Sequence, residues 1–286
     1  MHASDRLLAA IDRIGAPVCV GLDPVVERLP TAVGSGIAPI ERIERYCSDL
    51  LDALSGTVPC VKPQSACFER FGHQGVAVLE RIVARSRALG LEVVLDAKRG
   101  DIGISAEHYA EAAFGHAAAA DWITVNGYLG EDGIRPFLRP ERGAFVLVRT
   151  SNPGGDALQQ EALADGRTIA QAMADLVATI GAGRIGQRGY SDLGAVVGAT
   201  KRQDAVELRR RMPQQILLVP GYGAQGGSLD DALVCFNRDG QGAIVTASRS
   251  VIYAFERDDP RWQDAVHAAA AAFRDEVGGA VSRPCG

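Results

Sequence analysis

Short apolar segments recur along this chain, and most are separated by stretches with the pattern of amphipathic or alanine-rich helices. A strand followed by a helix, repeated without a break in composition, is typical of a parallel sheet in which helices connect the strands. The eight apolar segments lie at residues 18–22, 58–61, 93–95, 122–125, 144–148, 193–197, 216–219 and 243–246. We therefore predict one (β/α)8 TIM barrel of the α/β class, with an open, doubly wound sheet as the alternative.

The segments between the predicted strands supply the helices of this barrel. The clearest helical patterns lie at residues 40–54, 76–89, 105–118, 203–212, 229–237 and 262–277, with one more at 167–180 inside the long connection 152–192. Leu7, Ile11 and Ile14 recur at helical spacing, so residues 1–16 are expected to form an N-terminal helix. We expect a single domain over residues 1–286 that ends in a loose tail at 278–286.

Composition and charge argue against several kinds of partner. The 286-residue chain is 47% hydrophobic and has a net charge of -5, without the clustered Lys and Arg that a nucleic-acid backbone requires. Its first residues lack the layout of a signal peptide, and no apolar stretch approaches the ~18 residues of a membrane span. The six cysteines are scattered, several of them within apolar segments, as is typical of reduced, buried thiols. We expect a cytoplasmic protein that binds neither nucleic acid nor membranes.

Two acids and a lysine follow the third apolar segment, where a buried strand has no structural need for charge. Asp96 and Lys98 are two residues apart, so on an extended chain both point to the same face. Asp101 comes directly after Gly100, which allows the backbone to turn. A lysine held between two carboxylates suits a site that handles a proton and a negative charge. The alternative is a structural salt bridge where a strand meets a helix.

Polar side chains also follow most of the other predicted strands. The active site of a TIM barrel forms at the C-terminal ends of its strands, so these side chains should meet on one rim. The rim residues, in chain order, are Asp23, Lys62, Asp96, Lys98, Asn126, Thr150, Ser151, Thr200, Pro220, Ser248 and Arg249.

The loops after the seventh and eighth strands have the composition of a phosphate site. Residues 220–228 read PGYGAQGGS, and Ser248 and Arg249 follow the eighth strand. Phosphate sites in such barrels are commonly built from these two loops, where glycines let backbone N–H groups approach the anion. Arg249 can bind two oxygens at once, and Gln225 can serve as a neutral donor. Without this placement, the glycine-rich loop would be read equally well as a simple flexible turn.

With these positions assembled, the chain resembles the orotidine 5′-phosphate decarboxylase family, in particular its longer bacterial (type 2) subgroup. The D-x-K-x-x-D element is shared with related sugar-phosphate enzymes, and its combination with Lys62 and the Gln225 loop makes the match specific. The matching motifs follow the family order and cover nearly the whole barrel: GLDP at 21–24, VKP at 61–63, DAKRGDI at 96–102, RTSNP at 149–153, PGYGAQGG at 220–227 and SR at 248–249.

The resemblance implies a role for each matching residue. The catalytic set would be an alternating network of Lys62, Asp96, Lys98 and Asp101, with Asp101 reaching in from the other subunit of a homodimer. The substrate-binding set would be Asp23 at the ribose, Ser151 at the pyrimidine ring, Gln225 and Arg249 at the 5′-phosphate, Ile102 and Ser105 beside Asp101, and Asn126, Thr150 and Pro220. The family usually has threonine at position 105, so Ser105 keeps the hydroxyl and loses a methyl group.

Several of these residues also have a purely structural interpretation. Asp23 and Ser151 could form turns, and Lys62 could be a solvent-exposed lysine at the rim. Ser105 could cap the helix that follows it, and Asn126 could be a turn residue.

The reaction implied by the resemblance removes CO₂ from C6 of orotidine 5′-monophosphate and leaves uridine 5′-monophosphate. The electron pair left at C6 lies in the ring plane, where the ring cannot readily delocalise it. The sequence carries no fingerprint for pyridoxal phosphate, thiamine or a metal, so we expect no cofactor and electrostatic stabilisation by preset groups. Lys98 is the expected proton donor, kept charged by Asp96 and Asp101.

Two alternatives differ in class from this function. The first is a related Mg²⁺-dependent barrel enzyme, a keto-gulonate phosphate decarboxylase or hexulose phosphate synthase. Those enzymes carry an acid where this chain has Lys62, and a lysine there is poorly placed to help bind a metal. The second is a non-catalytic barrel that only binds a nucleotide or sugar phosphate, which would have no need of four charged residues in one site.

Overall fold

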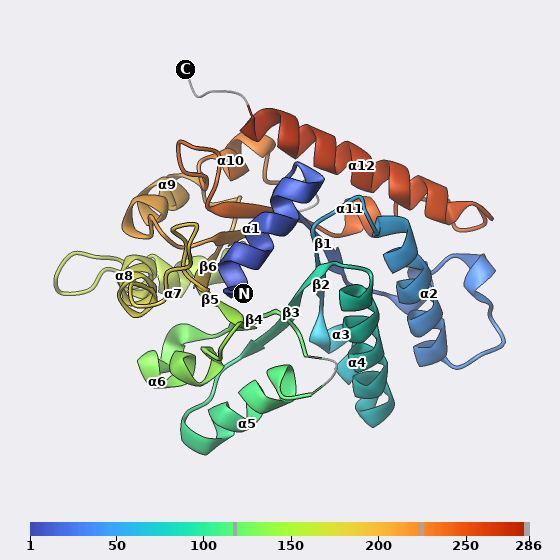
Figure 1. Cartoon of the computed structure of the whole chain (residues 1–286), viewed down its shortest axis with the longest axis horizontal. Coiled ribbons are helices and arrows are strands. Elements are labelled where there is room, and N and C mark those ends of the chain that lie inside the picture. The colour runs from blue at the N-terminus through green and yellow to red at the C-terminus, as the bar shows by residue number, and fades with distance from the viewer. Residues whose placement is uncertain (117–118, 224–225, 283–286) are drawn as a thin grey trace.

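Eight parallel strands close into a barrel in chain order, with β1 paired to both β2 and β8 (Figure 1). The computed structural model describes residues 1–116, 119–223 and 226–282. The strands are β1 Val18–Leu22, β2 Cys60–Pro63, β3 Glu92–Arg99, β4 Trp122–Val125, β5 Gly143–Arg149, β6 Leu193–Val197, β7 Leu217–Val219 and β8 Ala243–Ala247. The predicted TIM barrel is confirmed, and the open-sheet alternative is wrong because Val18 of β1 pairs with Val245 of β8.

Helices surround the barrel on its outside (Figure 1). The α-helices are α1 Ala3–Ile14, α2 Pro39–Leu54, α3 Ser65–Glu69, α4 Gly72–Ala88, α5 Gly103–Phe114, α6 Glu131–Ile134, α7 Asp156–Gln159, α8 Ile169–Gly181, α9 Arg202–Arg211, α10 Leu229–Leu233, α11 Arg249–Ile252 and α12 Trp262–Val281. Short 3₁₀ turns lie between them: η1 Val26–Arg28, η2 Thr31–Val33, η3 Gly127–Leu129, η4 Arg135–Phe137 and η5 Pro153–Gly155.

The C-terminal helix is longer than the sequence pattern indicated. The loose tail was expected from residue 278, but α12 continues to Val281. Gly278 is buried in this helix, and a Cβ there would lie 2.9 Å from the backbone oxygen of Gly15. This close packing against the end of α1 keeps the last turn helical although its residues are small. Residues 283–286 lie outside the part of the chain that the structure describes.

Two strands are displaced from their predicted bounds in a way that matters for the site. The predicted strand at 58–61 is β2, Cys60–Pro63, and the predicted strand at 93–95 is the longer β3, Glu92–Arg99. Lys62, Asp96 and Lys98 therefore lie within strands rather than in the loops beyond them. The predicted strands end too early because an apolar run ends at its first charged residue, whereas the hydrogen bonding between the strands continues beyond it.

An apolar layer fills the barrel below the strand ends. Its side chains come from the strands and include Trp122 and Phe145, which stack with 4.7 Å between ring centroids. Ala3, Leu7 and Leu8 of α1 belong to the same buried cluster, so α1 covers the N-terminal end of the barrel. α1 therefore closes the barrel at that end.

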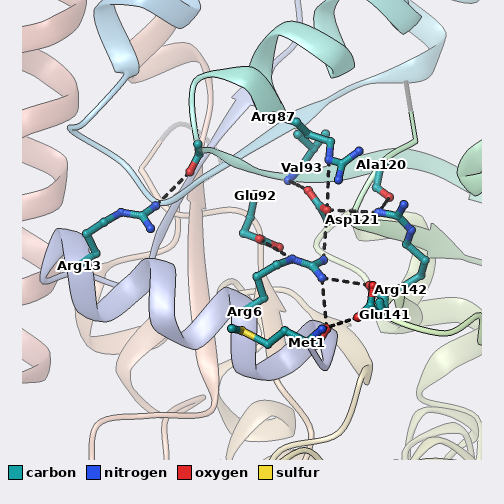
Figure 2. Close-up of polar contacts among 11 residues, drawn as sticks. Met1, Arg6, Arg13, Arg87, Glu92, Val93, Ala120, Asp121, Glu141 and Arg142 are labelled. Carbon is teal, nitrogen blue, oxygen red and sulfur yellow. Dashed lines mark hydrogen bonds and ion pairs between the residues drawn. The ribbon is translucent and has the colours of Figure 1, made fainter. Parts of the chain in front are cut away.

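A charged network fastens α1 to this closed end (Figure 2). Arg6 of α1 donates to Glu92 Oε1 at 2.8 Å and to Asp121 Oδ1 at 3.1 Å. Asp121 also accepts the Val93 backbone N–H at 3.0 Å and lies 3.4 Å from the guanidinium of Arg142. Glu92 Oε2, in contrast, is buried and has no hydrogen-bond partner in the part of the chain that the structure describes. The network thus leaves one carboxylate oxygen unsatisfied.

We expect Glu92 to make the protein less stable as the pH rises through the range of about 5 to 7. Burial first, and then the nearby Asp121 carboxylate, raises the pKa of Glu92 to about 7, although Arg6 opposes the shift. Between the ordinary pKa of a glutamate and pH 7 the folded state therefore holds a proton that the unfolded chain releases. The free energy of unfolding should fall by on the order of 2 kcal/mol across this window and then level off.

The measurement is urea unfolding of the wild type and of Glu92→Gln at pH 5, 6, 7 and 8. The difference in unfolding free energy between the two proteins should grow in favour of the variant from pH 5 to 7. All other residues are the same in both proteins, so their contributions cancel in this difference. A difference that is constant with pH would show that Glu92 does not titrate in this range.

Candidate active site

A cavity of about 470 Å³ opens at the C-terminal ends of the strands, a size within the range of about 300–1,000 Å³ common for small-molecule sites. Each strand, or the loop directly after it, contributes to its lining. The residues that line it are Asp23, Lys62, Gln64, Asp96, Lys98, Thr124, Leu147, Thr150, Ser151, Asn152, Val196, Leu218, Pro220, Gly221, Tyr222, Thr246, Ser248 and Arg249.

Asp96 is the centre of the charged part of this cavity. Its Oδ2 accepts a hydrogen bond from Lys62 Nζ at 2.6 Å and one from Gln64 Nε2 at 3.2 Å. Its Oδ1 accepts from Lys98 Nζ at 2.6 Å and from Thr124 Oγ1 at 2.9 Å. Both oxygens of the carboxylate thus accept hydrogen bonds from donors at the ends of two other strands, β2 and β4, and from its own strand β3.

Burial and the neighbouring charges shift the pKa of Asp96 in opposite directions, and the effect of the charges is the larger. Burial by itself would raise the pKa of Asp96, but Lys62 and Lys98 outweigh it and hold that pKa well below the ordinary value. Burial would likewise lower the pKa of Lys62, but Asp96 and then Asp23 raise it above the usual range. Asp96 and Lys62 are therefore ionised at neutral pH, and the site carries fixed charges before any ligand arrives.

Lys98 reaches Asp96 from an unusual backbone conformation. Its φ is 47°, in the left-handed region, and the pairing of β3 with β4 shifts register between Leu95 and Arg99. The Lys98 backbone N–H donates to Thr124 Oγ1 at 3.0 Å, which secures this conformation. The meeting of Asp96 and Lys98 is as predicted, but strand alternation is not its cause. A strained residue held by a specific partner is a feature common at functional sites.

Thr124 should matter for turnover because its hydroxyl binds both Asp96 and the backbone of Lys98. It donates to Asp96 Oδ1 and accepts the Lys98 N–H. Thr124→Val keeps the shape and removes both bonds, so kcat should fall about tenfold or more while KM changes little. Thr124→Ser should keep most of the activity. Steady-state kinetics of both variants test this, and equal kcat values in the valine and serine variants would contradict it.

Two polar atoms in the cavity wall are buried and have no hydrogen-bond partner among the described residues. They are Asp23 Oδ1, on the loop after β1, and Thr246 Oγ1, on β8. An unpaired buried oxygen is costly, and a ligand hydroxyl would remove that cost. Thr246 is on β8 and Asp23 directly follows β1, the strand paired with β8, so both atoms belong to the same part of the cavity wall.

The loops after β7 and β8 form another wall of the cavity. A Cβ at Gly21 would lie 1.9 Å from Ser248 Oγ, so only glycine there lets the β8 loop approach β1. The stem of the β7 loop is held by the Gly227 N–H, which donates to the Gly221 oxygen at 3.0 Å, and by Tyr222, whose hydroxyl donates to Glu276 at 2.6 Å. Pro220, Ser248 and Arg249 line the cavity here. Gln225 lies outside the described residues.

Comparison with known proteins adds to this geometry. The model of the "Orotidine 5'-phosphate decarboxylase / HUMPS family" matches residues 16–259, which include the entire barrel. The chain belongs to this family.

Relatives within the orotidine 5′-phosphate decarboxylase family match almost end to end. A protein of that name from Rhodopirellula baltica is 42% identical over 98% of this chain and 100% of its own length. Another of that name from Roseiflexus sp. is 42% identical, covering 89% of this chain and 90% of its own. Among solved structures, the OMP decarboxylase of Leishmania donovani is 32% identical with a TM-score of 0.78, covering 98% of this chain and 99% of that chain. A solved structure from Streptomyces avermitilis reaches a TM-score of 0.85 at 37% identity, covering 99% and 96%.

Four residues assigned from the family pattern do not line the cavity: Asp101, Ile102, Ser105 and Asn126. Asp101 accepts the Ile102 N–H at 2.8 Å, and the side chains of Ile102, the N-cap of α5, and Ser105, in its first turn, are exposed. Ser105 is also not the helix cap that the alternative suggested, because the cap position of α5 is Ile102. Asn126 accepts the Tyr128 N–H at 3.0 Å and caps η3, which is the structural interpretation.

Sequence reasoning assigned no role to five polar residues that line the cavity: Gln64, Thr124, Asn152, Tyr222 and Thr246. Thr124 and Thr246 stand inside apolar strands, where a single threonine is unremarkable because threonine favours strands. Their common signal is a polar side chain at an inward-facing position of a barrel strand. That signal becomes readable only once the register is known. The solvent-exposed interpretation of Lys62 is wrong, since Lys62 is buried.

Two further findings concern metals and membranes. Within residues 1–116, 119–223 and 226–282, no three His, Cys, Asp or Glu side chains are grouped so as to hold a metal ion. Over the same residues, no helix has the length and apolar character to cross a membrane.

Proposed function

We propose that this chain is an orotidine 5′-phosphate decarboxylase, a carboxy-lyase that converts orotidine 5′-monophosphate to uridine 5′-monophosphate and CO₂ in pyrimidine biosynthesis. The observation that carries the proposal is the Asp96 carboxylate bound by both Lys62 and Lys98 inside the barrel cavity. Relatives of that name at 42% identity support the same function. We place the protein in the cytoplasm, in keeping with five described cysteines that are all free thiols.

In the proposed mechanism, Lys98 stabilises the negative charge that develops at C6 and then donates a proton there. Its ammonium is a compact charge, already oriented by the 2.6 Å bond to Asp96. Loss of CO₂ breaks the C6–carboxylate bond and leaves the electron pair at C6, which takes the proton from Lys98 Nζ. Asp96 also repels the substrate carboxylate, a smaller contribution than the stabilisation by Lys98. The reaction consumes one proton, which solvent returns to Lys98.

In this proposal, the remaining cavity residues each bind a different part of the substrate. Asp23, with its unpaired Oδ1, would accept a ribose hydroxyl. Thr150 and Ser151, after β5, would bind the edge of the pyrimidine ring. Arg249, with Gln225 and the loop after Pro220, would hold the 5′-phosphate. Phosphate binding far from C6 would then help to drive the reaction at the ring.

We further propose that the protein is a homodimer in which Asp101 completes the partner's site. The supporting feature is an apolar surface beside Asp101 that stays exposed in the single chain. It includes Ile102 and Ile104 at the start of α5, and Tyr128 and Leu129 of η3. The two segments lie side by side at Gly133. A Cβ at this position would be 3.3 Å from the backbone oxygen of Asp101 and 3.1 Å from Leu129 Cβ. Exposed side chains of this kind are typical of an interface.

The first test of the function follows the ultraviolet absorbance of orotidine 5′-monophosphate with purified protein, with and without a chelator. Loss of the orotate band that a chelator does not affect is the expected result. Activity abolished by the chelator would favour the Mg²⁺-dependent sugar-phosphate enzymes of the same family. Tight binding of uridine 5′-monophosphate without any turnover would identify a non-catalytic barrel.

A further inference from the structure

A cluster of charges around one buried arginine lies behind the wall of the cavity formed by the loop after β5. Its centre is Arg149, the last residue of β5, whose side chain is 0% exposed. The guanidinium donates to Asp204 Oδ2 at 2.6 Å, to Asp156 Oδ1 at 2.7 Å and to Gln159 Oε1 at 3.1 Å. Lys201 Nζ adds bonds of 2.7 and 2.9 Å to the Asp156 carboxylate. We call these five residues the Arg149 clamp; none of them lines the cavity.

Gln159 connects the clamp to the cavity wall. Its Oε1 accepts the Thr150 backbone N–H at 2.9 Å, and its Nε2 donates to Thr150 Oγ1 at 2.9 Å. One amide side chain therefore holds both the backbone and the hydroxyl of Thr150, while Arg149 fixes the amide from behind. Thr150, Ser151 and Asn152 line the cavity in sequence, so Gln159 determines where this turn presents its polar groups.

Two glycines allow the turn to be enclosed this closely. A Cβ at Gly155 would lie 2.8 Å from Thr150 Oγ1 and 3.2 Å from Gln159 Oε1. A Cβ at Gly198, after β6, would lie 2.9 Å from Ser151 Cα. Neither glycine has a positive φ, so what each position requires is space rather than an unusual backbone. The turn is thus packed from two sides and bonded from a third.

We infer that Gln159 is a positioning residue for the ring end of the substrate, acting through the turn of Thr150, Ser151 and Asn152. The inference rests on the proposed function and adds the origin of base specificity. A turn fixed in this way presents hydroxyl and backbone groups in a set arrangement, which suits recognition of the imide edge of a uracil or orotate ring. A cytosine ring presents an amino group and an unprotonated N3 on that edge, the reverse of the carbonyl and N3–H of uracil. Groups fixed for uracil would therefore be left unpaired, which is a strong basis for discrimination.

The main experiment compares Gln159→Met with Gln159→Glu. Methionine removes every bond to Arg149 and Thr150 at similar volume, whereas glutamate still accepts from Arg149 and from the Thr150 N–H. The measurements are kcat and KM, and the dissociation constants of uridine 5′-monophosphate, cytidine 5′-monophosphate and ribose 5-phosphate. In Gln159→Met, binding of uridine 5′-monophosphate should weaken about tenfold, and its preference over the cytidine compound should shrink about as much. Ribose 5-phosphate should bind as in the wild type, and Gln159→Glu should restore most of the loss.

A matched pair of glycine variants tests the same point without changing any polar group. Gly155→Ala forces Gln159 and Thr150 apart and should reproduce the losses of Gln159→Met. Gly154→Ala is the control, since its Cβ would meet only Asn152 Nδ2 at an ordinary 3.7 Å. It should leave binding unchanged.

The results separate the inference from the proposed function. Wild-type protein that does not decarboxylate orotidine 5′-monophosphate would overturn the function, whatever the variants do. With an active wild type, an unchanged preference for uridine over cytidine 5′-monophosphate in Gln159→Met would overturn the positioning role. An equal loss of ribose 5-phosphate binding would do so too, because it would indicate general damage to the barrel. If Gln159→Met does not fold, as judged by thermal unfolding, the comparison of Gly155→Ala with Gly154→Ala decides.

Discussion

Replacing Lys98 with alanine should abolish turnover, with kcat falling on the order of 10⁴-fold or more. The reason is that Lys98 makes two contributions in the proposed mechanism, stabilisation of the negative charge at C6 and donation of the proton. Each of these is large by itself. The side chain is 48% exposed, so its removal should not disturb folding. Asp96 keeps its bonds to Lys62, Gln64 and Thr124. The measurement is kcat by the orotate absorbance, with thermal unfolding as the check on folding.

The comparison that gives this result meaning is Arg249→Ala. Arg249 is assigned to the phosphate, so its loss should raise KM much more than it lowers kcat. Lys98→Ala should bind uridine 5′-monophosphate within a few-fold of the wild type, because the phosphate and ribose contacts are intact. Near-normal turnover in Lys98→Ala would rule out the proposed mechanism.

Asp101→Ala should also be almost inactive, and its activity should be recoverable by mixing. If Asp101 acts in the partner's site, a dimer of one Lys98→Ala and one Asp101→Ala subunit has one site with both changes and one with neither. Random pairing of the two variants makes half of the dimers mixed, so about a quarter of the wild-type activity should return. Coexpression of the two chains with different tags and assay of the isolated mixture provides the measurement.

Each variant alone, carried through the same procedure, is the control and should stay inactive. If Asp101 served the site of its own chain, every site in the mixture would carry one of the two changes, and no activity would return. A monomeric protein of normal activity would equally contradict the shared site. The outcome therefore depends on which chain supplies Asp101, and not on how much any single residue contributes.

The barrel itself is predictable from the sequence because each of its strands is an apolar run long enough to recognise. β1, β4 and β6 have the predicted bounds. Errors occur where charge enters a strand, as at Lys62 and Asp96, since a buried charge is rare and an apolar pattern stops at it. The charged residues of the site are thus the same residues that make the ends of their strands difficult to predict.

The site is predictable to the extent that its residues follow strands. Asp23, Ser151 and Arg249 meet in one cavity because parallel strands bring their C-terminal ends together. Asn126 obeys the same rule of position, but its side chain turns back to its own backbone, a local hydrogen bond that asparagine favours. The role of Arg149 depends on Asp156 and Asp204, which come from separate segments, so no local pattern could reveal it.

β3 carries two buried carboxylates four residues apart, and they respond to acid in opposite senses. Glu92, at the closed end, has an unpaired oxygen and is easily protonated, whereas Asp96, at the open end, is saturated with donors and stays ionised. Mild acidification should therefore raise the free energy of unfolding, while Asp96 in the cavity keeps its charge. The pH at which this protein best resists denaturation need not be the pH at which it works fastest. A storage buffer and an assay buffer for it should be chosen separately.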